Sequence, residues 1–332
     1  MVRERAGRAS LALAFALVSS CMLLVAPSVA GAQPAAVRRV GVLAQDLQPG
    51  LLETFRGELQ RLGYVEGKTL AIEVRNAAGR ESRLPTQAAD LVRLKVEVIV
   101  AVNTPAALAA SKATSTIPIV LMRVADPVGQ GLVASLARPG GNVTGLNFMP
   151  DELGAKGIEL LHEMLPSITR VAALYWADNP GALFVVTETE RRSTQLGLHF
   201  LRLPVRGPAD FPGAFETAKR ARMEALFVMD DGAMTKRRKE VVELALRHSM
   251  AVVSIYRDFV EAGGFIAYGP SLSASYRRGA VYVDRILKGM KPADLPVEQP
   301  TKFDLAINMR TARTLGLTVP PSVLVRADHI IE

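Results

Sequence analysis

The sequence predicts an α/β protein made of two doubly wound parallel-sheet lobes. Short runs rich in β-branched residues alternate with amphipathic stretches along most of the chain, and this alternation is typical of parallel strands covered by helices. The alternation begins again after a segment rich in Gly and Pro, R-P-G-G-N at 138–142. About 300 residues beyond the N-terminal segment are enough for two domains.

The first half of this pattern predicts four strands and three helices. The first strand is expected at 37–43, and the helix that follows it, 51–62, has apolar residues at spacings of three and four. A later strand, V-E-V-I-V-A-V at 96–102, is apolar almost throughout, as buried parallel strands are. The remaining elements of this half are strands at 69–74 and 117–122 and helices at 84–94 and 105–113.

The second half repeats the alternation. Two short matching segments support this, because L-G-Y at 62–64 and L-G-L at 196–198 each precede the second strand of their half. The lobe boundary is expected near residues 146–151. The predicted helices are 154–165, 183–196, 211–221, 235–248 and 273–287, and the predicted strands are 171–176, 198–205, 225–229, 251–255, 264–267 and 303–307.

The N-terminus has the three parts of a secretory signal. Arginines at positions 3, 5 and 8 precede an apolar run at 11–25, and small residues follow. The apolar run is shorter than the roughly 20 residues of a membrane-spanning helix. We expect cleavage after Ala32, with Ala30 as the alternative, and therefore a periplasmic protein.

Cys21 leaves a second possibility open at this end. The segment V-S-S-C at 18–21 loosely resembles a lipoprotein box, which would leave Cys21 lipidated. However, residues 22–25 stay apolar where a lipoprotein usually becomes polar. We favour the cleaved signal, and Cys21 is the only cysteine, so the mature chain then has no disulfide and no thiol nucleophile.

The charge of the chain does not indicate a nucleic-acid partner. The formal net charge is +8, and the basic residues are spread along the sequence. The densest basic run, K-R-R-K at 236–239, is flanked by glutamates and is typical of a solvated helix face. Aromatic residues are scarce and do not alternate with the basic ones, so nucleic acid is not expected as a partner.

Polar residues follow the strands of the first half, where parallel sheets bind their ligands. Gln45 follows the first strand, and Asp126 follows the fourth. After the third strand, Asn103 and Thr104 precede a proline and begin a helix with Ala106 and Ala107. This helix start has two interpretations that the residues leave open: a plain helix cap, or backbone N–H groups that bind a carboxylate.

The second half has its own candidates, but no recognisable reaction centre. Asp230, Tyr256 and Tyr268 follow later strands. Asp230 and Asp231 could act as paired carboxylates, although the favoured interpretation is that one of them caps the next helix and the other faces the cleft. The four histidines are scattered, and no metal-binding, nucleophile-elbow or phosphate-loop motif is present. We therefore expect no enzyme, no metal and no cofactor.

Several of these segments together resemble one family, the ABC transporter substrate-binding proteins of the type that includes the tryptophan-binding TrpX-like proteins. The most specific of them are A-D-P-V-G-Q-G-L-V at 125–133 and R-P-G-G-N-V-T-G at 138–145. The others are R-R-V-G-V-L-A-Q at 38–45, L-G-Y-V-E-G-K at 62–68, V-N-T-P-A-A at 102–107, I-P-I-V at 117–120 and L-K-G-M-K-P-A-D-L-P-V-E at 287–298.

The resemblance implies a type I periplasmic-binding fold, with two lobes joined by three hinge strands that close on a small ligand. It implies an N-terminal lobe of residues 33–147 and about 270–298, and a C-terminal lobe of residues 148–269 and about 299–332. Thr104 and the amides of Ala106 and Ala107 would lie near a ligand carboxylate, and Asp126 near a ligand amine. Asp230, Tyr256 and Tyr268 would come from the second lobe and the hinge.

The chain departs from the family pattern at the strand ends. The family often has Gly where Asn103 stands, D-N or D-N-T where this chain has D-D-G at 230–232, and S-Y-G where it has A-Y-G at 267–269. These positions lie in the implied pocket. The resemblance therefore leaves the ligand open, tryptophan in particular.

The sequence favours a transport receptor that captures a small solute, such as an amino acid or another carboxylate, between its lobes. It would present this ligand, as a monomer, to an ABC permease in the inner membrane. A ligand sensor for a membrane receptor has the same sequence features and stays as an alternative. An exported hydrolase using Asp126 or Asp230 is less favoured, because no nucleophile and base are paired. A DNA-binding repressor is disfavoured by the export signal.

Overall fold

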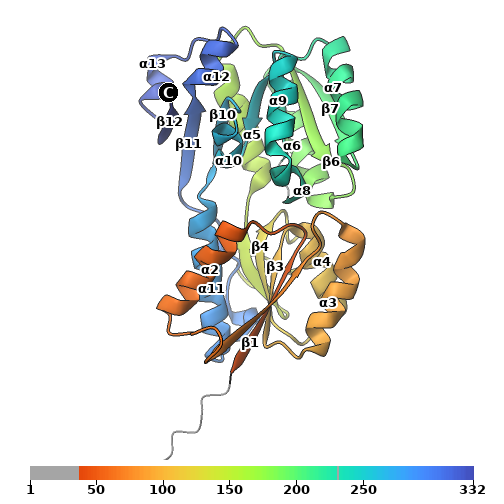
Figure 1. Ribbon diagram of the computed structural model, residues 1–332, viewed down its shortest axis with the longest axis vertical. Helices are drawn as coiled ribbons and strands as arrows, with labels where there is room; N and C mark the ends of the chain where they lie inside the picture. Colours follow the sequence, from red (N-terminus) through yellow and green to blue (C-terminus); the bar gives the residue numbers. More distant parts are fainter. Residues whose placement is uncertain (1–36, 230–231) are drawn as a thin grey trace, which may run out of the picture. The chain divides into compact units, whose positions relative to one another are not determined.

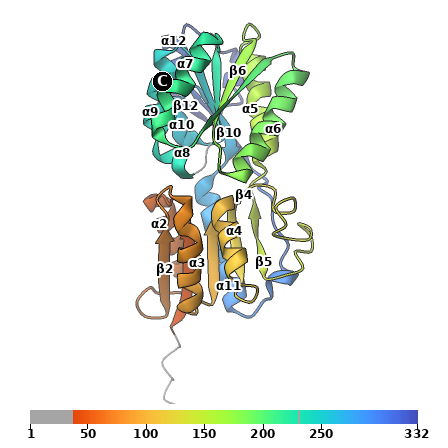
Figure 2. The same cartoon turned by 90° about the vertical axis from the view of Figure 1, so that its right-hand side faces the viewer.

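The computed structural model describes residues 37–229 and 232–332. The predicted signal peptide, Cys21 and the candidate site residue Asp230 lie outside the described residues. Within them, two sheets form two α/β lobes (Figures 1 and 2). The predicted fold class is confirmed.

The sheet of the first lobe has the strand order β2-β1-β3-β4-β5, and all its pairs are parallel. Two helices cover each face, with α2 and α11 on one side and α3 and α4 on the other (Figure 1). The strands are β1 (Arg38–Ala44), β2 (Leu70–Asn76), β3 (Val98–Val102), β4 (Ile119–Val124) and β5 (Val143–Asn147). The helices are α2 (Pro49–Arg61), α3 (Leu84–Arg93), α4 (Thr104–Ala113) and α11 (Leu272–Leu287).

The sheet of the second lobe has the order β12-β11-β10-β9-β8-β6-β7. One face packs against α5, α6, α12 and α13, and the other against α7, α8, α9 and α10. The strands are β6 (Arg170–Trp176), β7 (His199–Val205), β8 (Ala225–Val228), β9 (Ala251–Ser254), β10 (Ile266–Pro270), β11 (Phe303–Asn308) and β12 (His329–Ile331). The helices are α5 (Pro150–Met164), α6 (Pro180–Gln195), α7 (Phe211–Arg220), α8 (Gly232–Lys236), α9 (Arg238–Arg247), α10 (Arg257–Glu261), α12 (Met309–Thr314) and α13 (Pro321–Leu324).

This second sheet is mixed, although parallel pairing was predicted throughout. β10 and β11 pair antiparallel, from Ile266 with Ile307 to Pro270 with Phe303. The reason lies in the chain path. After β10 the chain leaves for the first lobe, where α11 packs on β3, β4 and β5, and it returns into β11 from that side.

The chain passes between the two sheets three times. The first passage follows β5 at Asn147, the second joins β10 to α11 near Ser271, and the third leads into β11 over residues 298–302. Backbone hydrogen bonds link the first and third passages, because Glu298 N–H donates to Gly145 O (2.9 Å) and Asn147 N–H donates to Glu298 O (2.9 Å). These passages position the strand ends of one lobe against the other.

The predicted elements of the first lobe are confirmed within two residues at each end, but the sequence patterns missed others. β5 was not predicted, because V-T-G-L-N is short and follows a Gly/Pro-rich turn. The predicted helix 235–248 is two helices, with Arg237 between α8 and α9 outside helical geometry (φ −99°, ψ 7°). The elements α10, α12, α13 and β12 are too short for the spacing of their apolar residues to reveal a helix or a strand.

No helix among the described residues is long and apolar enough to cross a membrane. The same residues contain no group of three His, Cys, Asp or Glu side chains placed to hold a metal ion.

Candidate functional site

Three polar residues lie in a row at the C-terminal edge of the first sheet. β1, β3 and β4 are adjacent, and their registers pair Ala44 with Val102 and Val102 with Met122. The next residues along these strands are Gln45, Asn103 and Arg123. They are 0%, 4% and 6% exposed, so the edge that was predicted to bind a ligand buries three polar side chains side by side.

Gln45 is only partly satisfied in this row. Its Nε2 donates to Glu81 Oε1 at 2.6 Å. Its Oε1 is buried without a hydrogen-bond partner among the described residues. An unpaired buried acceptor costs about 1–3 kcal/mol, so this atom is placed to accept a hydrogen bond from a bound molecule.

Asn103 combines an unpaired side chain with a strained backbone. It has φ 76° and ψ 156°, a region that almost only Gly adopts and that costs other residues about 1–3 kcal/mol. Its Oδ1 is also buried without a partner among the described residues. The Asn side chain does not cap α4, so neither capping nor conformational preference explains an Asn at this position.

The start of α4 meets the expectation for an anion site only in part. Thr104 Oγ1 accepts from Ala125 N–H at 3.2 Å. Ala107 N–H is not free as expected, because it donates to Asn103 O at 3.1 Å. The helix has Pro at its second position, and the N–H of Ala106 has no acceptor among the residues described. Backbone N–H donors and the Thr104 hydroxyl therefore remain at this end.

The start of α6 in the second lobe lies directly against the start of α4. A Cβ atom on Gly181 would lie 2.5 Å from Thr104 Oγ1 and 3.2 Å from Ala125 Cβ. The Asn179 side chain caps α6 by accepting from Gly181 N–H at 3.0 Å. Two helix N-termini thus face each other across the lobes, and their approach requires Gly at position 181.

Arg123 is the functional candidate that the sequence patterns missed. Its Nε donates to Tyr256 OH at 3.1 Å, and its guanidinium carbon lies 4.5 Å from the centroid of the Tyr256 ring. Burial raises the pKa of the Tyr276 hydroxyl, while the charge of Arg123 and its hydrogen bond oppose that rise. A signal was present in the sequence, because Arg123 is the only charged residue in the buried strand I-V-L-M-R-V.

Tyr256 contacts both Arg123 and the aromatic ring of Phe148. It is 3% exposed, and its ring centroid lies 5.2 Å from that of Phe148, which follows β5. A small cavity of about 100 Å³ adjoins it, lined by Leu51 of the first lobe and by Tyr256, Ala267 and other residues. Tyr256, which was predicted to come from the second lobe or the hinge, thus contacts Arg123 of the first sheet.

The other predicted residues lie in different surroundings. Asp126 has φ 43°, and its Oδ1 accepts from Gly129 N–H at 2.9 Å, so the carboxylate caps its own turn. Tyr268 lies inside β10 and stacks on Phe303, with ring centroids 5.8 Å apart. Neither side chain makes a hydrogen bond to Gln45, Asn103 or Thr104 among the residues described.

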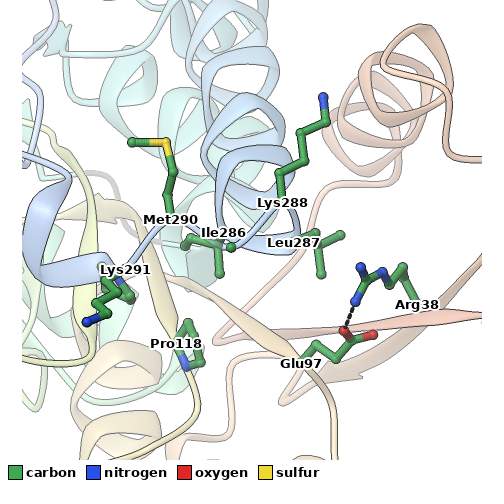
Figure 3. A pocket seen from close by; sticks show the side chains of 10 residues that line it. Arg38, Glu97, Pro118, Ile286, Leu287, Lys288, Met290 and Lys291 are labelled. Atoms are coloured by element: carbon green, nitrogen blue, oxygen red, sulfur yellow. Dashed lines mark hydrogen bonds and ion pairs between the residues drawn. The ribbon is translucent and has the colours of Figure 1, made fainter.

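A different hollow lies at the opposite end of the first sheet (Figure 3). Its volume is about 540 Å³, and it is lined by the ion pair of Arg38 with Glu97 (2.6 Å) and by the chain after α11, including Met290 and Lys291. Arg38 begins β1, and Glu97 immediately precedes β3. Parallel sheets bind ligands at the other ends of their strands, so the candidate site is the edge with Gln45 and Asn103.

Comparison with known proteins places these features in context. Residues 40–331 match the family model described as ABC transporter substrate binding protein. The tyrosine-binding protein of Clostridioides difficile is 24% identical over 285 residues, which are 84% of this chain and 81% of that protein.

Solved structures agree with this match. The structure of an ABC domain from Streptococcus pneumoniae in complex with L-Trp has a TM-score of 0.82 and 26% identity, covering 89% of this chain and 100% of that chain. A conserved domain protein from Vibrio cholerae has a TM-score of 0.81 and 28% identity, covering 89% and 99%. A leucine-binding protein from Thermotoga maritima, at 14% identity and a TM-score of 0.54, shares the fold and covers 78% of each chain.

Proposed function

Because the chain belongs to the family of ABC transporter substrate-binding proteins, we propose that it is the extracytoplasmic receptor of an importer for an aromatic amino acid. The ligand binds between the lobes, at the C-terminal edge of the first sheet, without being chemically changed. The lobes correspond to the two sheets with their helices, and their boundaries lie near residues 147, 270 and 298.

The pairing of donors and acceptors at this edge carries the proposal. The Ala106 N–H and the Thr104 hydroxyl offer hydrogen bonds to a carboxylate at the start of α4. The unpaired oxygens of Gln45 and Asn103 lie on neighbouring strands and offer acceptors to an ammonium group. A zwitterionic α-amino acid supplies both of these groups within a few ångströms of each other.

The relatives support an aromatic side chain. One is named for binding tyrosine, and another was crystallised with L-Trp. In this chain Tyr256 and Phe148 form an aromatic pair beside the guanidinium of Arg123. Such a wall suits a flat ring, because aromatic pairs and cation–π contacts add to the burial of apolar area.

The other predicted contacts remain part of the proposal. They are Ala107, Asp126, Asp230 and Tyr268, and a permease in the inner membrane is the partner that would receive the ligand. The predicted export signal supports a periplasmic location.

The test is a binding screen of the mature protein, residues 33–332, by thermal shift and isothermal titration calorimetry. The ligands are L-tyrosine, L-tryptophan, L-phenylalanine, L-leucine and benzoate. We expect one aromatic amino acid to bind at one site and to raise Tm, since a ligand present at 100 times its Kd stabilises the native state by about 2.7 kcal/mol. Binding of benzoate but no amino acid would contradict the assignment, and so would consumption of a ligand.

A second measurement tests whether the protein takes part in import. Cells that lack this gene should lose uptake of the radiolabelled amino acid that binds, and the gene supplied in trans should restore it. Uptake that is unchanged in the deletion strain would leave the protein a binder without a transport role.

A further inference from the structure

The three connections between the lobes surround a second cavity, which shares Phe148 with the aromatic wall proposed for the ligand. Its volume is about 600 Å³. Its lining comes from residues 146–148 at the end of β5, from the end of β10 and the start of α11 within residues 270–278, and from residues 298–302 before β11 together with Asp304 inside β11. Gln45, Asn103 and Thr104 do not line it. Its volume lies in the range of about 300–1,000 Å³ that is typical of small-molecule sites.

One side of this cavity is apolar. Leu146, Phe148, Pro270 and Pro300 contribute to its wall. Phe148 is 4% exposed and packs on Tyr256, so it is held in place from behind. A wall of this kind suits the hydrocarbon part of a ligand.

The rest of the cavity lining includes charged side chains, and the basic ones outnumber the acidic ones. Arg278 is already engaged by Glu298, to which its Nε donates at 2.6 Å, and a second bond to the same carboxylate completes a bidentate pair. In contrast, Arg277 and Lys302 form no ion pair with any described residue, and Asp304 is the one remaining acid in the lining. The unpaired groups therefore favour an anion.

We propose that this hinge cavity binds a small organic monocarboxylate with an apolar body, as a second site separate from the ligand site. The carboxylate lies toward Arg277 and Lys302, and the hydrocarbon lies against Leu146 and Phe148. Binding at the hinge cavity does not depend on the function proposed above, because it needs no ligand between the lobes.

Occupancy of the hinge cavity also restrains the hinge. A molecule that contacts all three connections favours whichever lobe arrangement preserves those contacts. The hydrogen bonds Glu298 N–H to Gly145 O and Asn147 N–H to Glu298 O lie in two of these connections. Phe148, which lines the cavity and packs on Tyr256, provides a physical contact with the ligand site.

The probe for this test is octanoate, which has a carboxylate and an apolar chain but no amino group. Calorimetry with the full mature chain should show one octanoate site, with weaker binding of the neutral octanamide. Lys302→Glu and Arg277→Glu should each weaken octanoate binding about fivefold or more, the equivalent of one exposed ion pair. Both side chains are exposed, so these variants should fold.

Two controls decide where the probe binds. Lys291→Glu makes the same charge change at an exposed residue beside the other hollow and should leave octanoate binding unchanged. Asn103→Gly alters the ligand site and should also leave it unchanged. Equal octanoate affinity in wild type, Lys302→Glu and Arg277→Glu would overturn the proposal, and so would loss of affinity in Asn103→Gly.

Amide hydrogen exchange tests the restraint on the hinge. Octanoate at a concentration near its wild-type Kd should slow exchange at the N–H groups of Asn147 and Glu298, and should slow it less in Lys302→Glu at the same octanoate concentration. Binding without slower exchange at these two amides would overturn the restraint while leaving the second site in place.

Discussion

At the scale of single residues, the site is marked by polar groups that the fold leaves unsatisfied. Gln45 and Asn103 each bury an oxygen without a partner among the described residues, and Asn103 also has a backbone conformation suited to Gly. Such costs are retained in proteins mainly where function requires them. This argument concerns the chemistry of the side chains and is independent of the family match.

Asn103→Gly should separate stability from binding. Removing the Cβ relieves the strain at φ 76°, so we expect the free energy of unfolding to rise by about 0.5–2 kcal/mol, the strain less the entropy cost of Gly. Loss of the Oδ1 acceptor should weaken binding of the amino acid found in the binding screen about fivefold to tenfold, as expected for one hydrogen bond. Urea denaturation and calorimetry measure the two effects.

The control for this substitution is Asn103→Ala, which removes the amide but keeps the Cβ. Its affinity should fall by the same factor as in Asn103→Gly, but its free energy of unfolding should not rise. If Asn103→Gly binds that amino acid as tightly as wild type, Asn103 is not a ligand contact.

At the scale of elements, the first lobe depends on a strand that the sequence patterns missed. β5 forms the edge of its sheet, and it meets the third connection through a bridge between Leu146 and Glu298. Gly145 has φ 131°, and a Cβ at this position would lie 2.3 Å from Leu121 N and 2.5 Å from Leu121 O. The contact atoms belong to the backbone of β4, so they cannot move without disturbing the sheet.

Gly145→Ala should therefore destabilise the protein by about 2–4 kcal/mol, through conformational strain together with overpacking. Urea denaturation followed by circular dichroism measures the loss. Gly141→Ala is the matched control, because no atom lies within 4 Å of its added Cβ and its φ is not positive. Equal stability of the two variants would show that β5 adjusts to a side chain at position 145.

At the scale of the whole molecule, close contacts between described residues join the two lobes. Gly181 lies against Thr104, Arg123 donates to Tyr256, and Lys236 Nζ lies 4.0 Å from Asp46 Oδ2. Each of these contacts joins one residue of the first lobe to one of the second. In a protein that binds between its lobes, substitutions here should change ligand affinity more than stability.

Gly181→Ala tests this expectation. The added Cβ would lie 2.5 Å from Thr104 Oγ1, so α6 must move away from α4 before the lobes can meet. We expect the affinity for the amino acid found in the binding screen to fall about tenfold, equivalent to about 1.4 kcal/mol, with little loss in the free energy of unfolding. Calorimetry and urea denaturation measure both quantities.

Gly213→Ala in α7 is the comparison, because its Cβ would meet no atom within 4 Å. It should bind the same amino acid like wild type and gain up to about 1 kcal/mol of stability from the better helix former. If Gly181→Ala also binds like wild type, the approach of α6 to α4 does not limit binding.

The sequence by itself determined the fold class and the elements of the first lobe other than β5, and it predicted the sheet edge at which to look for a ligand. These follow from local patterns, since the periodicity of apolar residues gives strands and helices and the ends of parallel strands share an edge. Thr104 and Ala106 were predicted from such local chemistry, as a proline-containing helix start.

Only the tertiary structure decided which of these residues meet. The role of Arg123 depends on Tyr256, which lies 133 positions away in the sequence, and the need for Gly181 depends on Thr104 in the other lobe. The antiparallel β11 depends on a chain path through both lobes. Such contacts leave no period in the sequence, because they are set by how separate elements pack and not by the spacing of residues within one element.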